Sequence, residues 1–183
     1  MNTSELLLIA PKRYGDTRGF FAETYSRRVY KEYGILDEFV QDNHSISQEV
    51  ETLRGLHFQA PPNAQAKLVR CGRGAIFDVA VDIRRGSPSY GKWKGYTLTA
   101  ENGHQLYIPV GFAHGFVTLE PNSEIVYKCS DYYTPKLERS ISWSDPEIKI
   151  DWPIYSNPIL SEKDAVAPMF KDTENPFIYG ENS

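Results

Sequence analysis

Cysteines and long apolar runs, which mark secreted and membrane proteins, are scarce in this chain. Its 183 residues include 2 cysteines, Cys71 and Cys129, too few for a disulfide framework, so free thiols in a reducing compartment are expected. No apolar run approaches the roughly 18 residues that a membrane-spanning helix needs. The first five residues lack a basic segment followed by an apolar one, so we expect no signal peptide. These absences predict a soluble, cytoplasmic protein that does not bind membranes.

An excess of positive charge is missing as well. The chain carries 20 Lys and Arg against 24 Asp and Glu, a formal net charge of -4, which provides no electrostatic footprint for nucleic acid. Linkers, low-complexity segments and repeats of fixed period are also absent. The length suits one domain, so we expect a single domain over residues 1–183. Its segment 152–183, rich in Pro and Asn, is expected to wrap around the rest.

Short strand signals follow one another through the middle of the chain. In Ala75–Ile83, positions 77, 79, 81 and 83 share one face and 78, 80 and 82 the other, but the sequence does not decide which face points inward. Other short β-branched or aromatic runs occupy 67–71, 95–99, 105–108, 115–119 and 124–128. Helix signals are limited to 26–33 and a turn at 161–164. This regular succession of short strands, with few helix signals, predicts an all-β sandwich or barrel with a few short helices.

Residues 103–114 fit the pattern Gly-x5-Pro-x-Gly-x2-His, which resembles the second cupin motif. Upstream, His57, Gln59 and Lys67 stand where a metal-binding cupin carries His, His and Glu, and His114 is the fourth position. An ammonium group repels a divalent cation, and an amide replaces imidazole poorly. We therefore expect a cupin-like double-stranded β-helix, or jelly roll, that keeps the pocket without the metal and suits an anionic ligand.

Seven motifs extend the resemblance to one family. They are Gly15–Phe21, Gln41–His44, Arg54–Gln59, Lys67–Arg70, Phe77–Arg84, Ile108–Gly115 and Tyr127–Tyr133. With them the chain resembles the dTDP-4-dehydrorhamnose 3,5-epimerase family from about Pro11 to Asp164. The resemblance implies a homodimer without metal or redox cofactor. Its substrate would be a nucleotide-diphosphate sugar, dTDP-4-dehydro-6-deoxy-D-glucose, inverted at carbons 3 and 5 to dTDP-4-dehydro-L-rhamnose.

Epimerisation next to a ketone sets chemical requirements that named residues can meet. It needs a base for the α-proton, an acid that returns a proton on the opposite face, and a donor or cation at the enolate oxygen. His57 is the natural base, because unperturbed imidazole titrates near neutral pH. The resemblance makes Asp164 the partner that orients His57, Tyr127 the proton donor and Lys67 the group at the carbonyl oxygen.

The resemblance also implies a set of residues that bind the substrate. These residues are Arg18, Phe21, Glu23, Gln41, Asp42, Asn43, Arg54, His114, Tyr132, Glu138 and Lys163. Arg18 and Arg54 suit phosphate oxygens, which a planar guanidinium binds in a bidentate manner. Tyr132 is the candidate to stack on the base. Arg84 and Arg85 are expected to form solvated pairs or strand-edge charges.

Several alternatives remain open at this point. One is an epimerase that inverts a single centre or acts on another nucleotide sugar, such as a GDP-4-keto-heptose. A second is a sugar-nucleotide-binding cupin without turnover, against which His57, Lys67 and Tyr127 argue. A third, a metal-dependent cupin enzyme, is disfavoured by Gln59 and Lys67. If Asp78 or Asp82 points inward, it would tune His57 or bind the sugar.

Overall fold

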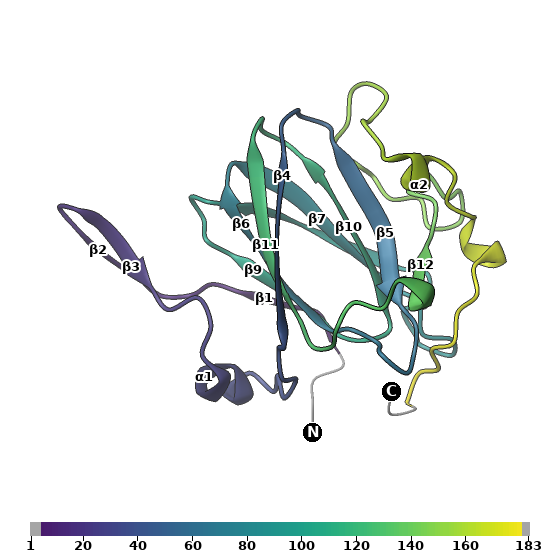
Figure 1. Cartoon of the computed structure of the whole chain (residues 1–183), viewed down its shortest axis with the longest axis horizontal. Coiled ribbons are helices and arrows are strands. Elements are labelled where there is room, and N and C mark those ends of the chain that lie inside the picture. The colour runs from purple at the N-terminus through teal and green to yellow at the C-terminus, as the bar shows by residue number, and fades with distance from the viewer. Residues whose placement is uncertain (1–4, 181–183) are drawn as a thin grey trace.

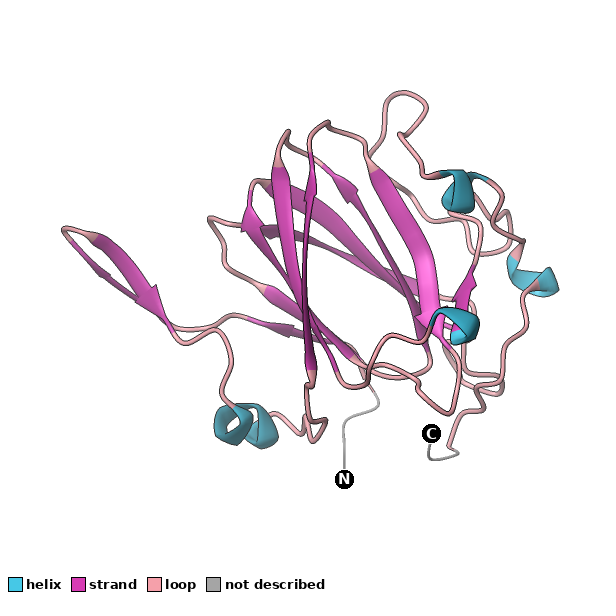
Figure 2. Ribbon diagram, in the orientation of Figure 1, coloured by secondary structure: helices cyan, strands magenta, loops and turns pink. Residues whose placement is uncertain are grey.

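Two five-stranded antiparallel sheets face each other in the computed structural model, which describes residues 5–180 (Figures 1 and 2). The first sheet runs in the order β1 (Leu7–Ile9), β9 (Gln105–Ile108), β6 (Lys67–Arg73), β11 (Ser123–Cys129) and β4 (Gln41–Ser47). The second runs β12 (Glu138–Ser140), β5 (Leu53–Gln59), β10 (Phe112–Thr118), β7 (Ala75–Asp82) and β8 (Trp93–Thr99). The predicted all-β jelly roll is confirmed. Residues 1–4, part of the segment that argued against a signal peptide, lie outside the described residues.

The remaining elements are short. A hairpin of β2 (Arg13–Asp16) and β3 (Gly19–Ala22) projects away from the sheets as an arm (Figure 1). The two α-helices, α1 (Arg27–Glu32) and α2 (Glu162–Ala165), lie where helix signals were found, and single 3₁₀ turns cover Pro135–Leu137 and Phe170–Asp172. Within residues 5–180, no helix has both the length and the apolar character needed to cross a membrane.

Strand β7 separates two hydrophobic cores. Ile76 and Ala80 point between the sheets and pack with residues of both, whereas Val79 and Val81 belong to a core on the outer side of the second sheet. This resolves the parity that the sequence left open. Asp78, two residues from both Ile76 and Ala80, shares their inward face.

The C-terminal segment covers the outer side of the second sheet. Trp152, Phe170 and Phe177 are buried in the same core as Val79 and Val81. Burial of each large aromatic ring typically contributes about 1.5–3 kcal/mol, which fastens a segment that has little regular structure. The segment also runs beside the start of β5, where the backbone N–H of Leu53 donates to the carbonyl of Ile159 at 2.9 Å. The segment that ends in α2 is therefore held next to β5.

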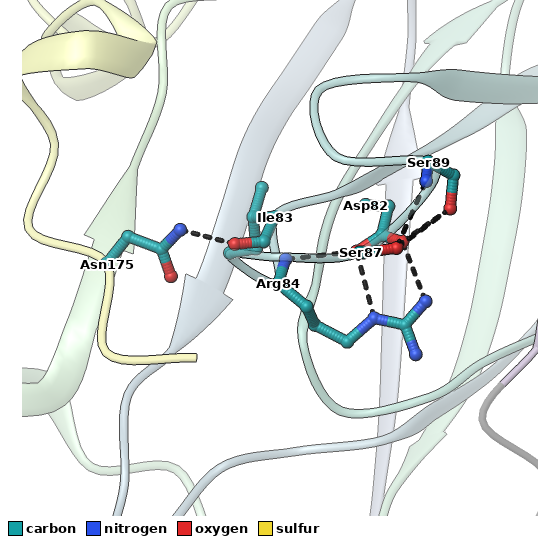
Figure 3. Close-up of polar contacts among 6 residues, drawn as sticks. All are labelled: Asp82, Ile83, Arg84, Ser87, Ser89 and Asn175. Carbon is teal, nitrogen blue, oxygen red and sulfur yellow. Dashed lines mark hydrogen bonds and ion pairs between the residues drawn. The ribbon is translucent and has the colours of Figure 1, made fainter. Parts of the chain in front are cut away.

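A buried ion pair closes the turn after β7 (Figure 3). Arg84 donates to both carboxylate oxygens of Asp82, at 2.9 and 2.7 Å, and the hydroxyls of Ser87 and Ser89 each donate to Asp82 Oδ2 at 2.6 Å. Arg84 is 6% exposed, so the prediction of a solvated pair was wrong for this residue. Nearby, the tail residue Asn175 donates its amide to the carbonyl of Ile83, which ties the tail to the barrel (Figure 3).

Candidate active site

A cavity of about 300 Å³ lies between the two sheets. The first sheet contributes residues of β4, β6 and β11, and the second contributes residues of β5 and β12. Its lining residues are Gln41, Asn43, His57, Phe58, Gln59, Gln65, Lys67, Tyr127, Tyr133 and Glu138. Three of the four predicted catalytic residues and three of the predicted binding residues are therefore brought together in one cavity.

Two glycines set the position of His57 on β5. Gly55 has a φ of 118°, and a Cβ there would lie 2.6 Å from Cα of Gly115 on β10. A Cβ on Gly115 would in turn lie 2.9 Å from the carbonyl oxygen of Arg54. Only glycine combines this backbone conformation with such a close approach. The contact lies beside a bulge in the β5–β10 pairing, where His57 stands directly opposite His114.

His57 is held by Asp164 across 107 positions of sequence. Their side chains meet at 2.5 Å, His57 Nε2 to Asp164 Oδ1. The hydroxyl of Ser161 caps α2 by accepting from the Asp164 backbone N–H at 3.1 Å, which fixes the start of the helix that carries Asp164. Burial opposes the charged form of Asp164 and is the largest single effect. The hydrogen bond and the charge interaction with His57, together with weaker hydrogen bonds from Ser161 and Gly55, outweigh it and lower the pKa of the carboxyl below its usual value. Asp164 is therefore an anion at neutral pH that can orient the ring and support its protonation.

Tyr127 reaches the same cavity from the opposite sheet. It lies on β11, paired with Asn43 of β4 and Val69 of β6, whereas His57 lies on β5 of the second sheet. Burial raises the pKa of the Tyr127 hydroxyl, so the phenol stays protonated at neutral pH. A sugar ring held between the sheets would face the imidazole of His57 on one side and the protonated phenol of Tyr127 on the other.

Lys67 extends from β6 into the cavity wall. Burial lowers the pKa of its ammonium group below that of an exposed lysine, because the charged form is costly away from water. A cation held in partly dry surroundings attracts developing negative charge more strongly than it would in water. Lys67 therefore suits the oxygen of an enolate.

Two more predicted residues form an ion pair at the edge of the cavity. Lys163 Nζ lies 2.6 Å from Glu138 Oε1, and the hydroxyl of Tyr133 donates to Glu138 Oε2 at 2.7 Å. Tyr133 lines the cavity, whereas Tyr132 does not and is 64% exposed. Our sequence reasoning missed Tyr133. The two tyrosines are adjacent, and the motif alone carried no signal to tell their orientations apart.

His114 lies on the cavity side of the second sheet, opposite the inward-facing Ala80, but is not among the lining residues. It is 8% exposed, and its Nε2 lies 2.7 Å from Asp78 Oδ1. Of the two acids in question, Asp78 points inward and pairs with His114 rather than with His57, and Asp82 pairs with Arg84. Neither acid tunes His57 through a direct bond. The role of His114 in binding substrate stays a prediction.

Other predicted binding residues are not brought to the cavity within one chain. Arg18, Phe21 and Glu23 belong to or adjoin the projecting arm, where the Arg18 side chain is 88% exposed and pairs with Asp16. Asp42 points to the outer face of β4 and pairs with Lys128 at 2.8 Å. Arg54 is not among the lining residues either, but its charge acts on Tyr127 and opposes the rise in the pKa of that hydroxyl. Its Nε donates to the hydroxyl of Ser47 at 3.2 Å.

The positions that bind metal in other cupins do not form a metal site here. Both ends of the Gln59 amide are engaged by loop backbone: its Nε2 donates to the carbonyls of Asn63 and Tyr132, and its Oε1 accepts from the N–H of Thr134. Lys67 contributes a cation where a carboxylate would be required. Among residues 5–180, no three His, Cys, Asp or Glu side chains gather into a set that could hold an ion. The donor set does not fit a metal.

Comparison with known proteins places this geometry in a family. A family model described as dTDP-4-dehydrorhamnose 3,5-epimerase matches residues 1–172. The dTDP-4-dehydrorhamnose 3,5-epimerase of Salmonella typhimurium strain LT2 is 54% identical over 166 residues, 90% of each chain.

Two solved structures share the fold closely. The Bacillus anthracis enzyme of the same name, with TDP and pyrophosphate bound, has a TM-score of 0.88 and 47% identity, covering 90% of this chain and 94% of that one. The Legionella pneumophila dTDP-6-deoxy-D-glucose-3,5-epimerase, in complex with dTDP-4-keto-L-rhamnose, also has a TM-score of 0.88. It is 50% identical, covering 93% of this chain and 92% of that one. This chain therefore belongs to the dTDP-4-dehydrorhamnose 3,5-epimerase family.

Proposed function

We propose that this protein inverts carbons 3 and 5 of dTDP-4-dehydro-6-deoxy-D-glucose to form dTDP-4-dehydro-L-rhamnose. His57, supported by Asp164, removes the proton next to the ketone. Lys67 stabilises the enolate oxygen, and Tyr127 returns a proton to the opposite face. The same steps, repeated at the second carbon, complete the reaction without an external cofactor.

One observation carries this proposal. The imidazole of His57, oriented by Asp164, and the protonated phenol of Tyr127 line one cavity from two facing sheets. Inversion requires removal and return of a proton on opposite faces of the sugar, and a base and an acid on opposite walls meet that requirement. Lys67 lines the same cavity and supplies the positive charge that stabilises an enolate oxygen. A module that only bound a sugar nucleotide would have no use for this arrangement.

The direct test is isotope incorporation. The protein is incubated in heavy water with dTDP-4-dehydro-6-deoxy-D-glucose and EDTA, and deuterium at carbons 3 and 5 is counted by NMR. We expect deuterium at both carbons, with the L-rhamno configuration in the product. One labelled and inverted carbon indicates a single-centre epimerase, and no exchange indicates a binding module. A GDP-linked 4-keto sugar, run in parallel, tests the choice of nucleotide.

Replacing Tyr127 by phenylalanine separates removal of the proton from its return. The variant keeps the ring but loses the proton that the hydroxyl delivers, so inversion should fall by about 100-fold or more. Exchange of solvent deuterium with retention, through His57, should continue. The control is Tyr96→Phe, another partly buried tyrosine of the barrel core, which should leave inversion intact. Loss of exchange together with inversion in Tyr127→Phe would assign the phenol to the first step instead.

The protein is also proposed to act as a C₂ homodimer. The β2–β3 arm stands away from the sheets with Tyr14, Phe20 and Phe21 at 55, 60 and 70% exposure. Exposed aromatic rings on a projecting hairpin are typical of a segment that packs on another chain. In such a dimer, Arg18, Phe21 and Glu23 would reach the partner's cavity, which explains their distance from the cavity of their own chain.

The dimer is tested by sedimentation. At micromolar concentration the wild type should sediment with twice the mass of one chain, and Phe21→Asp should shift it toward one chain because a carboxylate would be buried in the contact. Tyr155→Asp, at a residue that is 98% exposed elsewhere on the surface, should leave the mass unchanged. A wild type with the mass of a single chain would contradict the proposal.

A cytoplasmic location is proposed as well. Cys71 and Cys129 are both buried and unpaired, which suits a reducing compartment. The remaining binding roles all stay proposals: those of Gln41, Asp42, Asn43, Arg54, His114, Tyr132, Glu138 and Lys163. Because Tyr133 lines the cavity and Tyr132 does not, Tyr133 replaces Tyr132 as the preferred candidate to stack on the base of the nucleotide.

A further inference from the structure

Gln59 occupies the position of a metal ligand in other cupins, yet its side chain makes two hydrogen bonds to the loop of residues 131–134 and one to the β5–β6 loop at Asn63. Its Nε2 donates to the carbonyl of Tyr132 at 3.0 Å and to the carbonyl of Asn63. Its Oε1 accepts from the N–H of Thr134 at 2.8 Å. Both amide protons and the oxygen of a residue that is only 5% exposed are thus used on backbone groups.

Three further side-chain amides hold the same loop, residues 131–134. Gln41 accepts from the backbone N–H of Tyr133 at 3.0 Å. Gln65 donates to the carbonyl of Asp131 at 2.8 Å, and Asn63 donates to the Asp131 carboxylate at 3.2 Å. The loop lies outside the strand ladders, so these amides take the place of the hydrogen bonds that a sheet would provide.

What the loop presents to the cavity is the ring of Tyr133. The hydroxyl of that ring already donates to Glu138, and its backbone N–H is bound to Gln41. With its hydroxyl proton and its backbone N–H engaged, Tyr133 offers a ligand chiefly the faces of its ring. A flat aromatic face favours a flat partner, and among the parts of a nucleotide sugar only the base is flat.

We propose that Gln59 is a positioning residue for the nucleotide half of the substrate. It holds the backbone of residues 132 and 134 on either side of Tyr133, so that the ring stands in place before the ligand arrives. The inference rests on the proposed function for the identity of the ligand. The two ends of the cavity then have different roles. At one end, His57, Lys67 and Tyr127 act on the sugar. At the other end, Gln59 affects the affinity for the nucleotide by holding Tyr133 in position.

The test is Gln59→Glu, which replaces the donating NH₂ by an oxygen of equal size. That oxygen would face the carbonyls of Tyr132 and Asn63, so the loop should move away. We expect the dissociation constant for dTDP, measured by calorimetry, and KM to rise about 10-fold, with kcat changed by less than about 3-fold. Amide hydrogen exchange at Thr134 should accelerate, because in the displaced loop its N–H is no longer held against the side-chain oxygen of residue 59.

Asn175→Asp is the matched control. Its amide also donates to a backbone carbonyl, that of Ile83, and its oxygen accepts from the N–H of Phe177, but it lies on the tail across the outer core. The same exchange of NH₂ for oxygen there should leave KM and the affinity for dTDP unchanged. If Gln59→Glu fails to fold, Gln59→Met removes the three hydrogen bonds without adding charge and should give the same division between KM and kcat.

The outcomes separate this inference from the proposed function. Unchanged affinity for dTDP and unchanged exchange at Thr134 in a folded Gln59 variant would overturn the positioning role. A fall in kcat as large as the rise in KM would overturn it too, since it would place Gln59 at the reacting carbons. Failure of the wild type to label its substrate in heavy water would reject the epimerase assignment. The dTDP and hydrogen-exchange measurements, which need no turnover, would still decide on Gln59.

Discussion

Asparagine in place of His57 is expected to lower turnover by about 10²–10⁴-fold, the usual range for loss of a general base. Asparagine occupies the space near Asp164 and keeps a donor toward it, but it cannot take a proton from carbon at neutral pH. Binding of dTDP should change by less than about 3-fold, because the substitution lies at the sugar end. The measurement is kcat together with entry of solvent deuterium, and both should fall by the same factor.

A second histidine supplies the control for that result. His104 lies in the loop between β8 and β9 and is not among the residues that line the cavity. His104→Asn should therefore retain turnover within about 2-fold, as is usual for a substitution away from the chemistry. Deuterium exchange at a near-native rate in His57→Asn would remove His57 from the mechanism and point to another base.

Replacing Lys67 by methionine should be comparably damaging. Methionine fills similar space and removes the cation, so the enolate oxygen loses its charged partner. Loss of one such group typically costs about 10²–10³-fold in kcat. Lys94→Met, at an exposed position of β8, is the matched control and should leave kcat unchanged. A Lys67→Met enzyme with native kcat would mean that other groups carry the charge of the enolate.

The pH dependence offers an independent check on Lys67. Burial lowers the pKa of its ammonium group, so the charge is lost at a lower pH than in an exposed lysine. Activity that needs the charge should be full on the acidic side of that pKa and decline as pH rises through it. In Lys67→Arg, whose guanidinium stays protonated, this alkaline decline should disappear from the profile of kcat/KM.

Much of the barrel could be predicted because its strands carry their own signal. Strand β7 alternates between two faces, and the structure buries both. The face with Val79 and Val81 lies under the C-terminal segment, and the face with Ile76 and Ala80 lies inside the barrel together with Asp78. Strand β4 was not predicted, because Gln41–Ser47 contains few residues that favour strands. It forms through seven consecutive pairs with β11, a tertiary contact that local propensity does not reveal.

The site divides in a similar way. His57, Lys67 and Tyr127 were predicted from motifs, and the structure brings them to one cavity. The contact of His57 with Asp164 spans 107 residues, a distance over which spacing carries no geometric information. Whether Asp78 faced inward, and which of two adjacent tyrosines faced the cavity, depended on strand and loop orientation. Those orientations are set by packing and by side-chain amides rather than by residue type.

The origin of Asp164 has a consequence for how an active molecule is made. Synthesis proceeds from the N-terminus, and at about 5–20 residues per second the 107 positions between His57 and Asp164 take about 5–20 s to add. During that time the strands of both sheets have all been synthesised, since β12 ends at Ser140. Every strand of the two sheets is thus made before the carboxylate that orients the base. A chain released from the ribosome before α2 would carry His57 without its carboxylate and would also lack Phe170 and Phe177 of the outer core, so messages cut short should yield no active enzyme.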